Sequence, residues 1–176
     1  MSEFRPTLRP ALGTKQAVSN TALKLSPLPE GTIIHVLARR GEPDIVPFLD
    51  SLTKAAHALL PVSPGQWFIV GEEPMTHQEM KSLFAALEPR ATGVDQSHGR
   101  VRIRIEGAMA SRALSKGTAL DLDPSAFPVG QSAVTLIGHI AAHITRVDTD
   151  AFEIIVLRGF AESLWSDLAQ MSLEFG

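Results

Sequence analysis

The chain has no cysteine among its 176 residues, and its 13 glycines are dispersed. Without thiols it cannot form disulfide bonds, thiolate metal sites or a cysteine nucleophile. The scattered glycines form neither a phosphate-binding loop nor a dinucleotide fingerprint. Basic residues are not in excess either, because the net charge is -3. A general nucleic-acid binder would normally be basic, so we expect no nucleic-acid partner.

Long hydrophobic runs are also missing. The longest, Ala133–Ile144, is interrupted by His139 and His143 and is too short to cross a bilayer. Pro6 and Pro10 break the N-terminal segment, which lacks the apolar centre of a signal peptide. We therefore expect a soluble, cytoplasmic protein that has no membrane partner.

What the chain does contain is ordinary globular material, with 44% hydrophobic and 20% charged residues. Its length suits one domain or two small fused lobes. We expect an extended N-terminal arm over residues 1–31 and a single domain over 32–176. That domain could divide into lobes at 32–90 and 91–176.

The N-terminal arm is rich in proline and has no sustained periodicity. Two interpretations stay open. It is a loose tail, as termini often are, or it is an extended arm that lies along a neighbour. The second interpretation rests on apolar side chains that a solvated tail would usually lack, namely Val18, Leu23, Leu25 and Leu28.

In the first half, Thr32–Ala38 and Gln66–Val70 are typical of strands. Between them the pattern predicts a helix that Asp44 caps, that runs to about Leu60 and that Pro61 ends. Its apolar face would consist of Ile45, Phe48, Leu49, Leu52, Ala56, Leu59 and Leu60.

A second helix has a clearer start signal. Thr76 and Glu79 have the spacing of a capping box, in which each side chain bonds the other residue's backbone N–H. An apolar face follows, and Pro89 would end the helix. Its members are Met80, Leu83, Phe84 and Leu87.

Two further strands, Thr92–Gln96 and Arg100–Glu106, are predicted around the turn Ser97-His98-Gly99. A short helix from about Ala108 to Lys116 follows. Gly117 would close it in the left-handed conformation.

The last third combines two apolar runs with an amphipathic helix. The runs Ala133–Val147 and Ala151–Phe160 flank an acidic turn and predict strand, turn and strand. The inward face of the final helix is predicted to hold Phe160, Leu164, Leu168, Met171 and Phe175. The order of elements implies an α+β protein with a mostly antiparallel sheet covered by helices.

Two histidines and two aspartates are candidates for chemistry. His139 and His143 have the spacing of zinc ligands on a helix, but in a strand they would lie about 13 Å apart. We favour polar contacts on a half-exposed strand over a metal site. Asp121 and Asp123 lie in the expected ordered loop 118–130, where a loop-ordering role is a better explanation than acid–base chemistry.

A serine triad would have to combine Ser163 with His139 and Asp148. The nucleophile-elbow motif is absent, so we reject this triad. We therefore predict no catalytic, cofactor-binding or metal-binding residue on this chain.

Arginine alternates with aliphatic residues along the strand 100–106. Arg100, Arg102 and Arg104 therefore share one face, which could meet phosphate or nucleic acid. The acidic chain and the lack of interleaved aromatic residues favour a solvated face or a subunit contact. Trp165 lies about 100° from Leu164 around the helix axis, so it belongs to the core edge or anchors an interface. These four residues are our candidate subunit interface.

Three spaced segments resemble the gamma subunit of heterotetrameric sarcosine oxidase. The first is Val94-Asp95-Gln96-Ser97-His98 with the strand Arg100–Glu106 and Gly107-Ala108. The second is Leu114-Ser115-Lys116-Gly117, Leu120-Asp121-Leu122 and Phe127-Pro128-Val129-Gly130. The third is Thr135, Arg146, Asp148, Phe152-Glu153, Arg158, Phe160-Ala161 and Ser163-Leu164-Trp165. The resemblance covers roughly Val94–Leu168, with a looser similarity in Arg39–Pro61, and Gly159 departs from an expected serine.

The resemblance implies a cytoplasmic complex of four different subunits. The complex demethylates sarcosine to glycine, forms hydrogen peroxide and passes the one-carbon unit to tetrahydrofolate. FAD, FMN, NAD and tetrahydrofolate would be held by the larger alpha and beta subunits, which are the expected partners. The gamma subunit is similar in fold to the folate-binding region of the glycine-cleavage T-protein and is not expected to carry redox chemistry.

Our leading hypothesis is thus a non-catalytic assembly subunit. Two alternatives stay open. One is a small folate-binding one-carbon protein, and the other is a free-standing homo-oligomeric scaffold.

Overall fold

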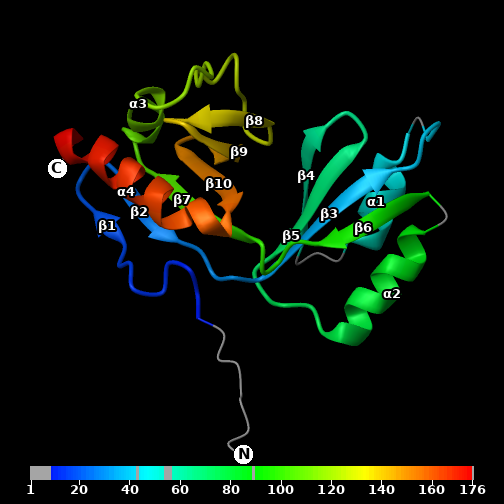
Figure 1. The fold of residues 1–176 in the computed structure, drawn as a ribbon. Coiled ribbons are helices and arrows are strands. Elements are labelled where there is room, and N and C mark those ends of the chain that lie inside the picture. The colour runs from blue at the N-terminus through cyan, green and yellow to red at the C-terminus, as the bar shows by residue number, and fades with distance from the viewer. Residues whose placement is uncertain (1–8, 43, 54–56, 89, 176) are drawn as a thin grey trace, which may run out of the picture.

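The computed structural model describes residues 9–42, 44–53, 57–88 and 90–175. These residues form two antiparallel sheets that lie in two lobes (Figure 1). One sheet has four strands in the order β4-β5-β3-β6, and the other has six in the order β1-β2-β7-β10-β9-β8. The α+β class predicted from the sequence is therefore confirmed.

The four-stranded sheet is built from a contiguous stretch of chain. Its strands are β3 (Thr32–Ala38), β4 (His57–Ser63), β5 (Gln66–Gly71) and β6 (Ala91–Asp95). Helices α1 (Val46–Leu52) and α2 (His77–Leu87) cover one of its faces. Ile34, Val36 and Ile69 point to these helices and are buried with them.

The predicted helix from Asp44 to Leu60 is wrong in length. Helix α1 spans only Val46–Leu52, its first residue follows Ile45, and no side chain caps it. The residues from His57 onward form strand β4, while Ala56 lies outside the described residues. Pro61 does not end a helix but lies within β4, an edge strand, where a missing N–H is tolerated.

The capping box at the start of α2 is confirmed. The backbone N–H of Glu79 donates to Thr76 Oγ1 at 3.3 Å, and the backbone N–H of Thr76 donates to Glu79 Oε2 at 3.0 Å. Leu83 and Leu87 are buried on the inward face of the helix. The predicted stop at Pro89 lies outside the described residues.

The six-stranded sheet combines the N-terminal arm with the second half of the chain. Its strands are β1 (Val18–Ser19), β2 (Lys24–Pro27), β7 (Arg100–Glu106), β8 (Ser132–Ile137), β9 (Ile140–Asp148) and β10 (Ala151–Leu157). Strand β2 pairs with β7, and Leu23 and Leu25 are buried in the core beside them. The described part of the arm therefore lies along the chain's own sheet.

A second correction concerns the run Ala133–Val147, which was predicted to be one strand. It contains two strands, β8 and β9, that pair with each other around Gly138 and His139. Gly138 has a positive φ of 61°, the backbone conformation that a tight hairpin turn requires. The last third is therefore a three-stranded meander of β8, β9 and β10.

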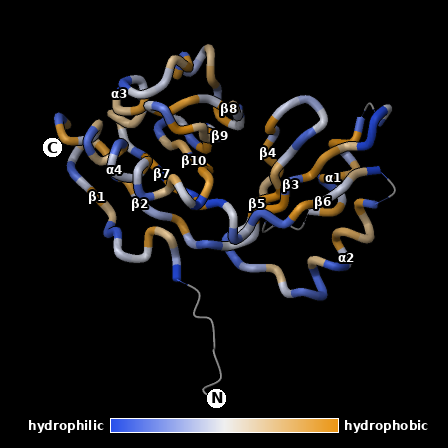
Figure 2. Tube along the Cα trace, in the orientation of Figure 1, coloured by the Kyte–Doolittle hydropathy of each residue, from blue (hydrophilic) through white to orange (hydrophobic). Residues whose placement is uncertain are grey.

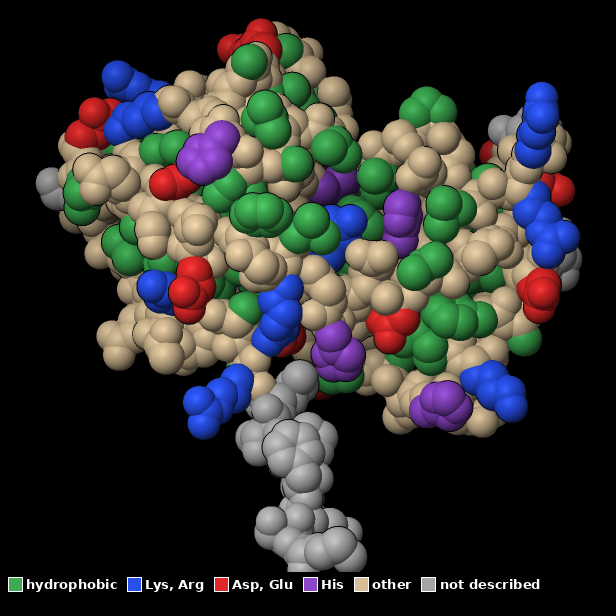
Figure 3. Space-filling view, viewed as in Figure 1, with side chains coloured by type: hydrophobic (Ala, Val, Ile, Leu, Met, Phe, Trp, Pro, Cys, Tyr) green, Lys and Arg blue, Asp and Glu red, His purple; other side chains and the backbone are tan. Residues whose placement is uncertain are grey.

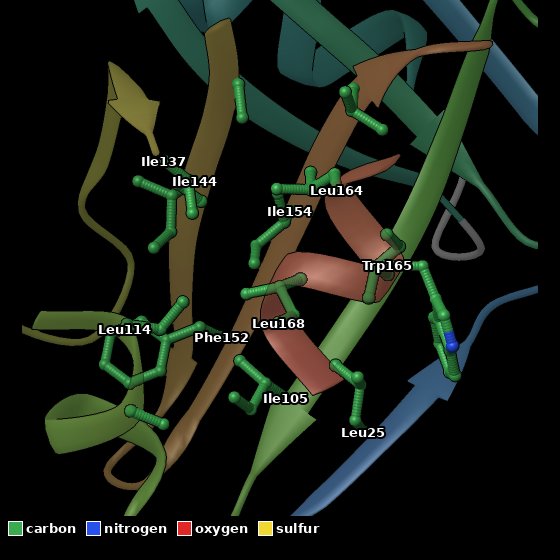
Figure 4. Packing of buried hydrophobic residues seen from close by; sticks show 14 of the residues in the cluster. Leu25, Ile105, Leu114, Ile137, Ile144, Phe152, Ile154, Leu164, Trp165 and Leu168 are labelled. Carbon is green, nitrogen blue, oxygen red and sulfur yellow. The ribbon is translucent and has the colours of Figure 1, made fainter. Parts of the chain in front are cut away.

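Helices α3 (Ala110–Ser115) and α4 (Ala161–Ser172) cover the outer face of the six-stranded sheet. In Figure 4 the side chains of Leu164 and Leu168 lie among those of the strands, and the side chain of Trp165 lies to one side of α4. Trp165 is only 4% exposed, so it belongs to the core of this lobe. Phe160, which was predicted to face inward, precedes α4 and is 53% exposed.

Gly117 follows α3 for a reason that differs from our prediction. It is not among the described glycines with positive φ, so the expected left-handed conformation is wrong. A Cβ atom at this position would lie 2.5 Å from Met171 Cε, because α4 crosses here. A side chain at this position would therefore displace the flexible end of the Met171 side chain.

The two sheets also contact each other. Their inner faces meet through a small buried cluster of Ile33, Phe68, Val70 and Ile155. The order of layers is thus helices, sheet, sheet and helices, and hydrophobic residues are concentrated in the strands (Figure 2). Within the described part of the chain, no helix is long and apolar enough to span a bilayer.

Candidate functional site

The inner face of β7 turns the arginine residues toward the four-stranded sheet. Val101, Ile103 and Ile105 point the other way, into the core under α3 and α4. The alternation in the sequence therefore separates the two faces as predicted. Figure 3 shows hydrophobic, histidine and basic side chains gathered in the hollow between the two lobes.

Two cavities lie between the inner faces. The Arg102 cavity has a volume of about 340 Å³, and residues that line it include His57, Leu60, Glu72, Arg102, Val147 and Glu153. The Arg100 cavity has a volume of about 230 Å³, and its lining includes Val62, Phe68, Arg100, Val134, His143 and Leu157. The cavities follow one another along β4, since Leu60 lines the first and Val62 lines the second.

Phe68 lines the Arg100 cavity, and its ring contacts one arginine and two histidine side chains. The guanidinium carbon of Arg100 lies 4.8 Å from the centroid of its ring. The ring of His143 meets Phe68 edge-on at a centroid distance of 5.3 Å, and the ring of His35 lies 5.1 Å away. Arg100 is held from the other side by Gln96, whose Oε1 accepts its Nε–H at 3.0 Å.

His143 joins the two sheets between the cavities. Its Nε2 atom lies 2.9 Å from the carbonyl oxygen of Pro61, across the gap from β9 to β4. The side chain is 3% exposed, so the half-exposed position predicted for it is wrong. The reason is that β4 covers the inner face of β9, which the sequence pattern of β9 does not reveal.

Burial changes the ionisation of both histidines at this junction. Desolvation lowers the pKa of His143 below 6.5, the bond to Pro61 opposes the shift, and the charge of Arg100 adds to it. Desolvation likewise lowers the pKa of His35. The hydrogen bond with Gln66 opposes this shift, and the repulsion from Arg100 adds to it. Both side chains are therefore neutral near neutral pH, which suits hydrogen bonding within the fold.

The Arg102 cavity adjoins a line of alternating charges across β2, β7 and β10. Lys24 pairs with Glu106 at 3.1 Å, and Glu106 pairs with Arg104 at 2.9 Å. Glu153 lies 3.8 Å from Arg104 and 2.9 Å from Arg102. Arg102 stands at the end of this line, and its side chain is 6% exposed.

Two guanidinium nitrogens of Arg102 have no acceptor. Its Nη2 atom donates to Glu153, whereas Nε and Nη1 are buried without a hydrogen-bond partner among the described residues. The Nδ1 atom of His57, which lines the same cavity, is also buried and unpartnered. The two buried N–H donors of Arg102 favour an acceptor oxygen from outside the chain.

The structure separates the four residues of the predicted subunit interface. It brings Arg100, Arg102 and Arg104 together on the inner face but places Trp165 in the core behind that sheet. Arg102 is buried, so the solvated face expected for all three arginines is wrong for this one. Whether Arg100 and Arg104 contact another subunit stays a prediction.

Sequence reasoning missed the groups that face the arginines. Phe68, His35 and His57 all belong to the four-stranded sheet. The one signal for their position was the alternation of β3 and β5, which places His35 and Phe68 on the face opposite Ile34 and Ile69. Glu153 lies in a predicted strand, but its partner Arg102 could be identified only once β10 was paired with β7.

The other candidates have structural roles or stand apart. Among the residues that the structure describes, no group of three or more histidine, aspartate or glutamate side chains could hold a metal. Asp121 accepts the backbone N–H of Asp123, and Asp123 accepts that of Ser125, each at 2.9 Å. These bonds confirm the predicted loop-ordering role.

The loop 118–130 is fixed mainly by Arg146, which is 1% exposed. Its guanidinium donates to the carbonyl oxygens of Leu122, Phe127 and Thr149. The guanidinium carbon also lies 4.5 Å from the ring centroid of Phe152. Arg146 is one of the motif residues, and in this fold it fixes a loop.

Comparison with known proteins gives a consistent result. The model of the sarcosine oxidase, gamma subunit family matches residues 46–174. No individual curated protein matches the chain by sequence.

Two solved structures have a similar fold. One is a heterotetrameric sarcosine oxidase from Corynebacterium sp. U-96 in complex with pyrrole 2-carboxylate. It has a TM-score of 0.81 and 19% identity, and the match covers 96% of each chain. The other is glycine cleavage system aminomethyltransferase T from Bartonella henselae, with a TM-score of 0.61 and 16% identity. That match covers 84% of this chain and 45% of the other.

The family match extends over most of both lobes and includes strand β7, the loop 118–130 and helix α4. The fold likeness to glycine cleavage aminomethyltransferase agrees with the similarity expected from the motifs. The chain belongs to the sarcosine oxidase gamma subunit family.

Proposed function

We propose that the chain is a non-catalytic assembly subunit of a heterotetrameric sarcosine oxidase. The observation that carries the proposal is the family match over residues 46–174. In this proposal the larger alpha and beta subunits hold FAD, FMN, NAD and tetrahydrofolate, and this chain holds none of them. The complex acts in the cytoplasm and converts sarcosine to glycine, with hydrogen peroxide and a one-carbon unit on tetrahydrofolate as its other products.

The mouth of the Arg100 cavity is suited to a subunit contact. Val134 and Leu157 line it and are 58% and 44% exposed, so two aliphatic side chains lie beside a partly buried arginine. The core of a protein interface is more apolar than its rim, and arginine is enriched there. We propose that a larger subunit covers this mouth.

Coexpression with candidate alpha and beta chains tests the proposal. We expect the three chains to copurify, and we expect Val134→Asp to reduce the amount of this chain that is retained. Val129→Asp is the matched control, because Val129 is 57% exposed but lies in the loop 118–130, outside the lining of the Arg100 cavity. Retention that is the same for both variants would argue against this surface. Flavin-yellow, sarcosine-oxidising material from the isolated chain would refute the non-catalytic role.

The fold likeness to the aminomethyltransferase keeps one alternative, a folate-binding one-carbon protein. Saturable quenching of Trp67 or Trp165 fluorescence by micromolar tetrahydrofolate would favour it. A homo-oligomeric scaffold would instead show one stable self-assembled mass in light scattering and would not bind the other subunits.

A further inference from the structure

The Arg102 cavity combines a buried cation with free hydrogen-bond donors. Arg102 is 6% exposed, and two of its guanidinium nitrogens, Nε and Nη1, lack an acceptor among the described residues. His57 adds a third unpartnered donor or acceptor atom, Nδ1, on the opposite wall. Natural proteins rarely leave such groups unpaired, so the arrangement indicates a missing partner that supplies oxygen.

The charges around Arg102 favour an anionic partner over a neutral one. The line of alternating charges contains the cations Lys24, Arg104 and Arg102 and the anions Glu106 and Glu153. Within this line three cations face two anions, while the exposed Glu72 on the cavity lining lies outside the line. Arg102 is the cation that lines the cavity, and its Nε and Nη1 atoms are buried without an acceptor among the described residues. A carboxylate would complete the alternation, because its oxygens accept N–H bonds and carry the opposite charge.

The walls of the cavity limit what can enter. The aliphatic part of the lining consists of Ala58, Leu60 and Val70 from the four-stranded sheet and Val147 from the six-stranded sheet. The volume of about 340 Å³ accommodates a short acid but not a large cofactor. Glu72 also lines the cavity, and its exposed carboxylate would repel the incoming anion.

From these observations we infer that the Arg102 cavity is a binding site for a carboxylate group on a short aliphatic chain. One carboxylate oxygen is held by Arg102, while His57 lies within the same cavity and the aliphatic part contacts Leu60 and Val147. The carboxylate has two possible sources, a free carboxylic acid or an acidic side chain of a partner subunit. The second source rests on the proposed assembly function, and the first does not.

The isolated full-length chain tests the shared chemistry. Sodium propionate would be titrated at constant ionic strength while the arginine Nε–H signals of ¹⁵N-labelled protein are followed by NMR. We expect one signal, which is missing in Arg102→Gln, to shift saturably, whereas the uncharged isostere propionamide leaves it in place. Arg40→Gln is the matched control, because Arg40 is exposed and outside the cavity.

Two further variants keep the test decisive if Arg102→Gln fails to fold. Ala58→Leu fills the cavity from its exposed edge without touching the pair Arg102–Glu153, and it should weaken propionate binding by about tenfold or more. Glu72→Gln removes the repelling charge and should tighten binding. Three results would each overturn the inference and leave only water in the cavity. They are a shift that does not saturate, an equal response to propionamide, and unchanged propionate binding in Ala58→Leu.

Hydrogen exchange of strand β4 in the coexpressed complex separates the two sources. If a partner's acidic side chain occupies the cavity, propionate protects β4 in the isolated chain but not in the complex, and Ala58→Leu reduces copurification. If the natural ligand is a free acid, propionate protects β4 in both. Because the NMR titration uses the isolated chain, its failure would leave the assembly proposal intact, and failed copurification would leave the carboxylate site intact.

Discussion

The Nε2 atom of His143 in β9 lies 2.9 Å from the carbonyl oxygen of Pro61 in β4, so a hydrogen bond links the two sheets directly. The two residues are 82 positions apart in the chain. Phe68 packs edge-on against the histidine ring, and the charge of Arg100 lies over the same phenyl ring. The ionisation of one imidazole is thereby coupled to the contact between the lobes.

The stability of the fold should fall as the solution becomes acidic. Burial lowers the folded-state pKa values of His143 and His35 below 6.5, so below that pH the unfolded chain binds more protons than the folded chain. We therefore expect a lower urea midpoint at about pH 5.5 than at about pH 7.5. His143→Gln should reduce this difference, whereas His139→Gln, in the exposed turn, should retain it. An unchanged pH dependence in His143→Gln would show that this histidine is not the coupled group.

Arg146 should be among the least replaceable side chains in the protein. Arg146→Lys removes the planar donor set, so at least one of the carbonyl groups of Leu122, Phe127 and Thr149 loses its buried partner. We expect a loss of about 3–5 kcal/mol in unfolding free energy and faster proteolysis within the loop 118–130. Arg112→Lys, at an exposed position on α3, serves as the control and should change stability little. Equal effects of the two substitutions would contradict the proposed role of Arg146 in holding the loop 118–130.

The contact between Gly117 and Met171 predicts non-additive mutations. Gly117→Ala should destabilise the fold by about 1 kcal/mol or less, because its Cβ would displace only the flexible end of the Met171 side chain. Met171→Ala removes that obstacle, so the double variant should lose less than the sum of the two single losses. Chemical denaturation of the four proteins measures the coupling, and strict additivity would place the strain elsewhere.

The ion pair between Glu30 and Arg158 should hold the arm to the end of β10. Arg158 Nη1 lies 2.8 Å from Glu30 Oε2, and the other carboxylate oxygen of Glu30 accepts the backbone N–H of Ala11 at 2.7 Å. A double-mutant cycle of Glu30→Gln and Arg158→Gln should give a coupling of about 1 kcal/mol that shrinks in high salt. Lys24→Gln with Glu106→Gln is a more exposed pair, and it should show weaker coupling.

Local signals in the sequence predicted several elements correctly. The capping box at Thr76 and Glu79 and the alternation along β7 depend on neighbours within a few residues, and both are present in the structure. The pattern failed between Asp44 and Pro61, because aliphatic residues there fit a helical face and an edge strand equally well. It also failed at Gly138, where a glycine within an apolar run was the sign of a turn.

Only one wall of the candidate site could be predicted from the sequence, for a similar reason. The arginine stripe is a property of one strand and could be predicted from its alternation. The residues that face it, among them Phe68 and His57, belong to a second sheet, and their approach depends on how the sheets meet. Apolar patterning shows that a face is buried but does not show which partner buries it.

The order of strands shows that one lobe is inserted into the other. Strands β2 and β7 are adjacent antiparallel partners, yet the whole four-stranded sheet lies between them in the chain. The first lobe is therefore nested inside what would otherwise be a hairpin, and the backbone leaves and re-enters the second lobe at one place. There the backbone N–H of Gln96 donates to the carbonyl oxygen of Ile33 at 2.8 Å. A two-residue turn that replaces the nested segment would convert β2 and β7 into a simple hairpin and remove the wall that faces Arg102.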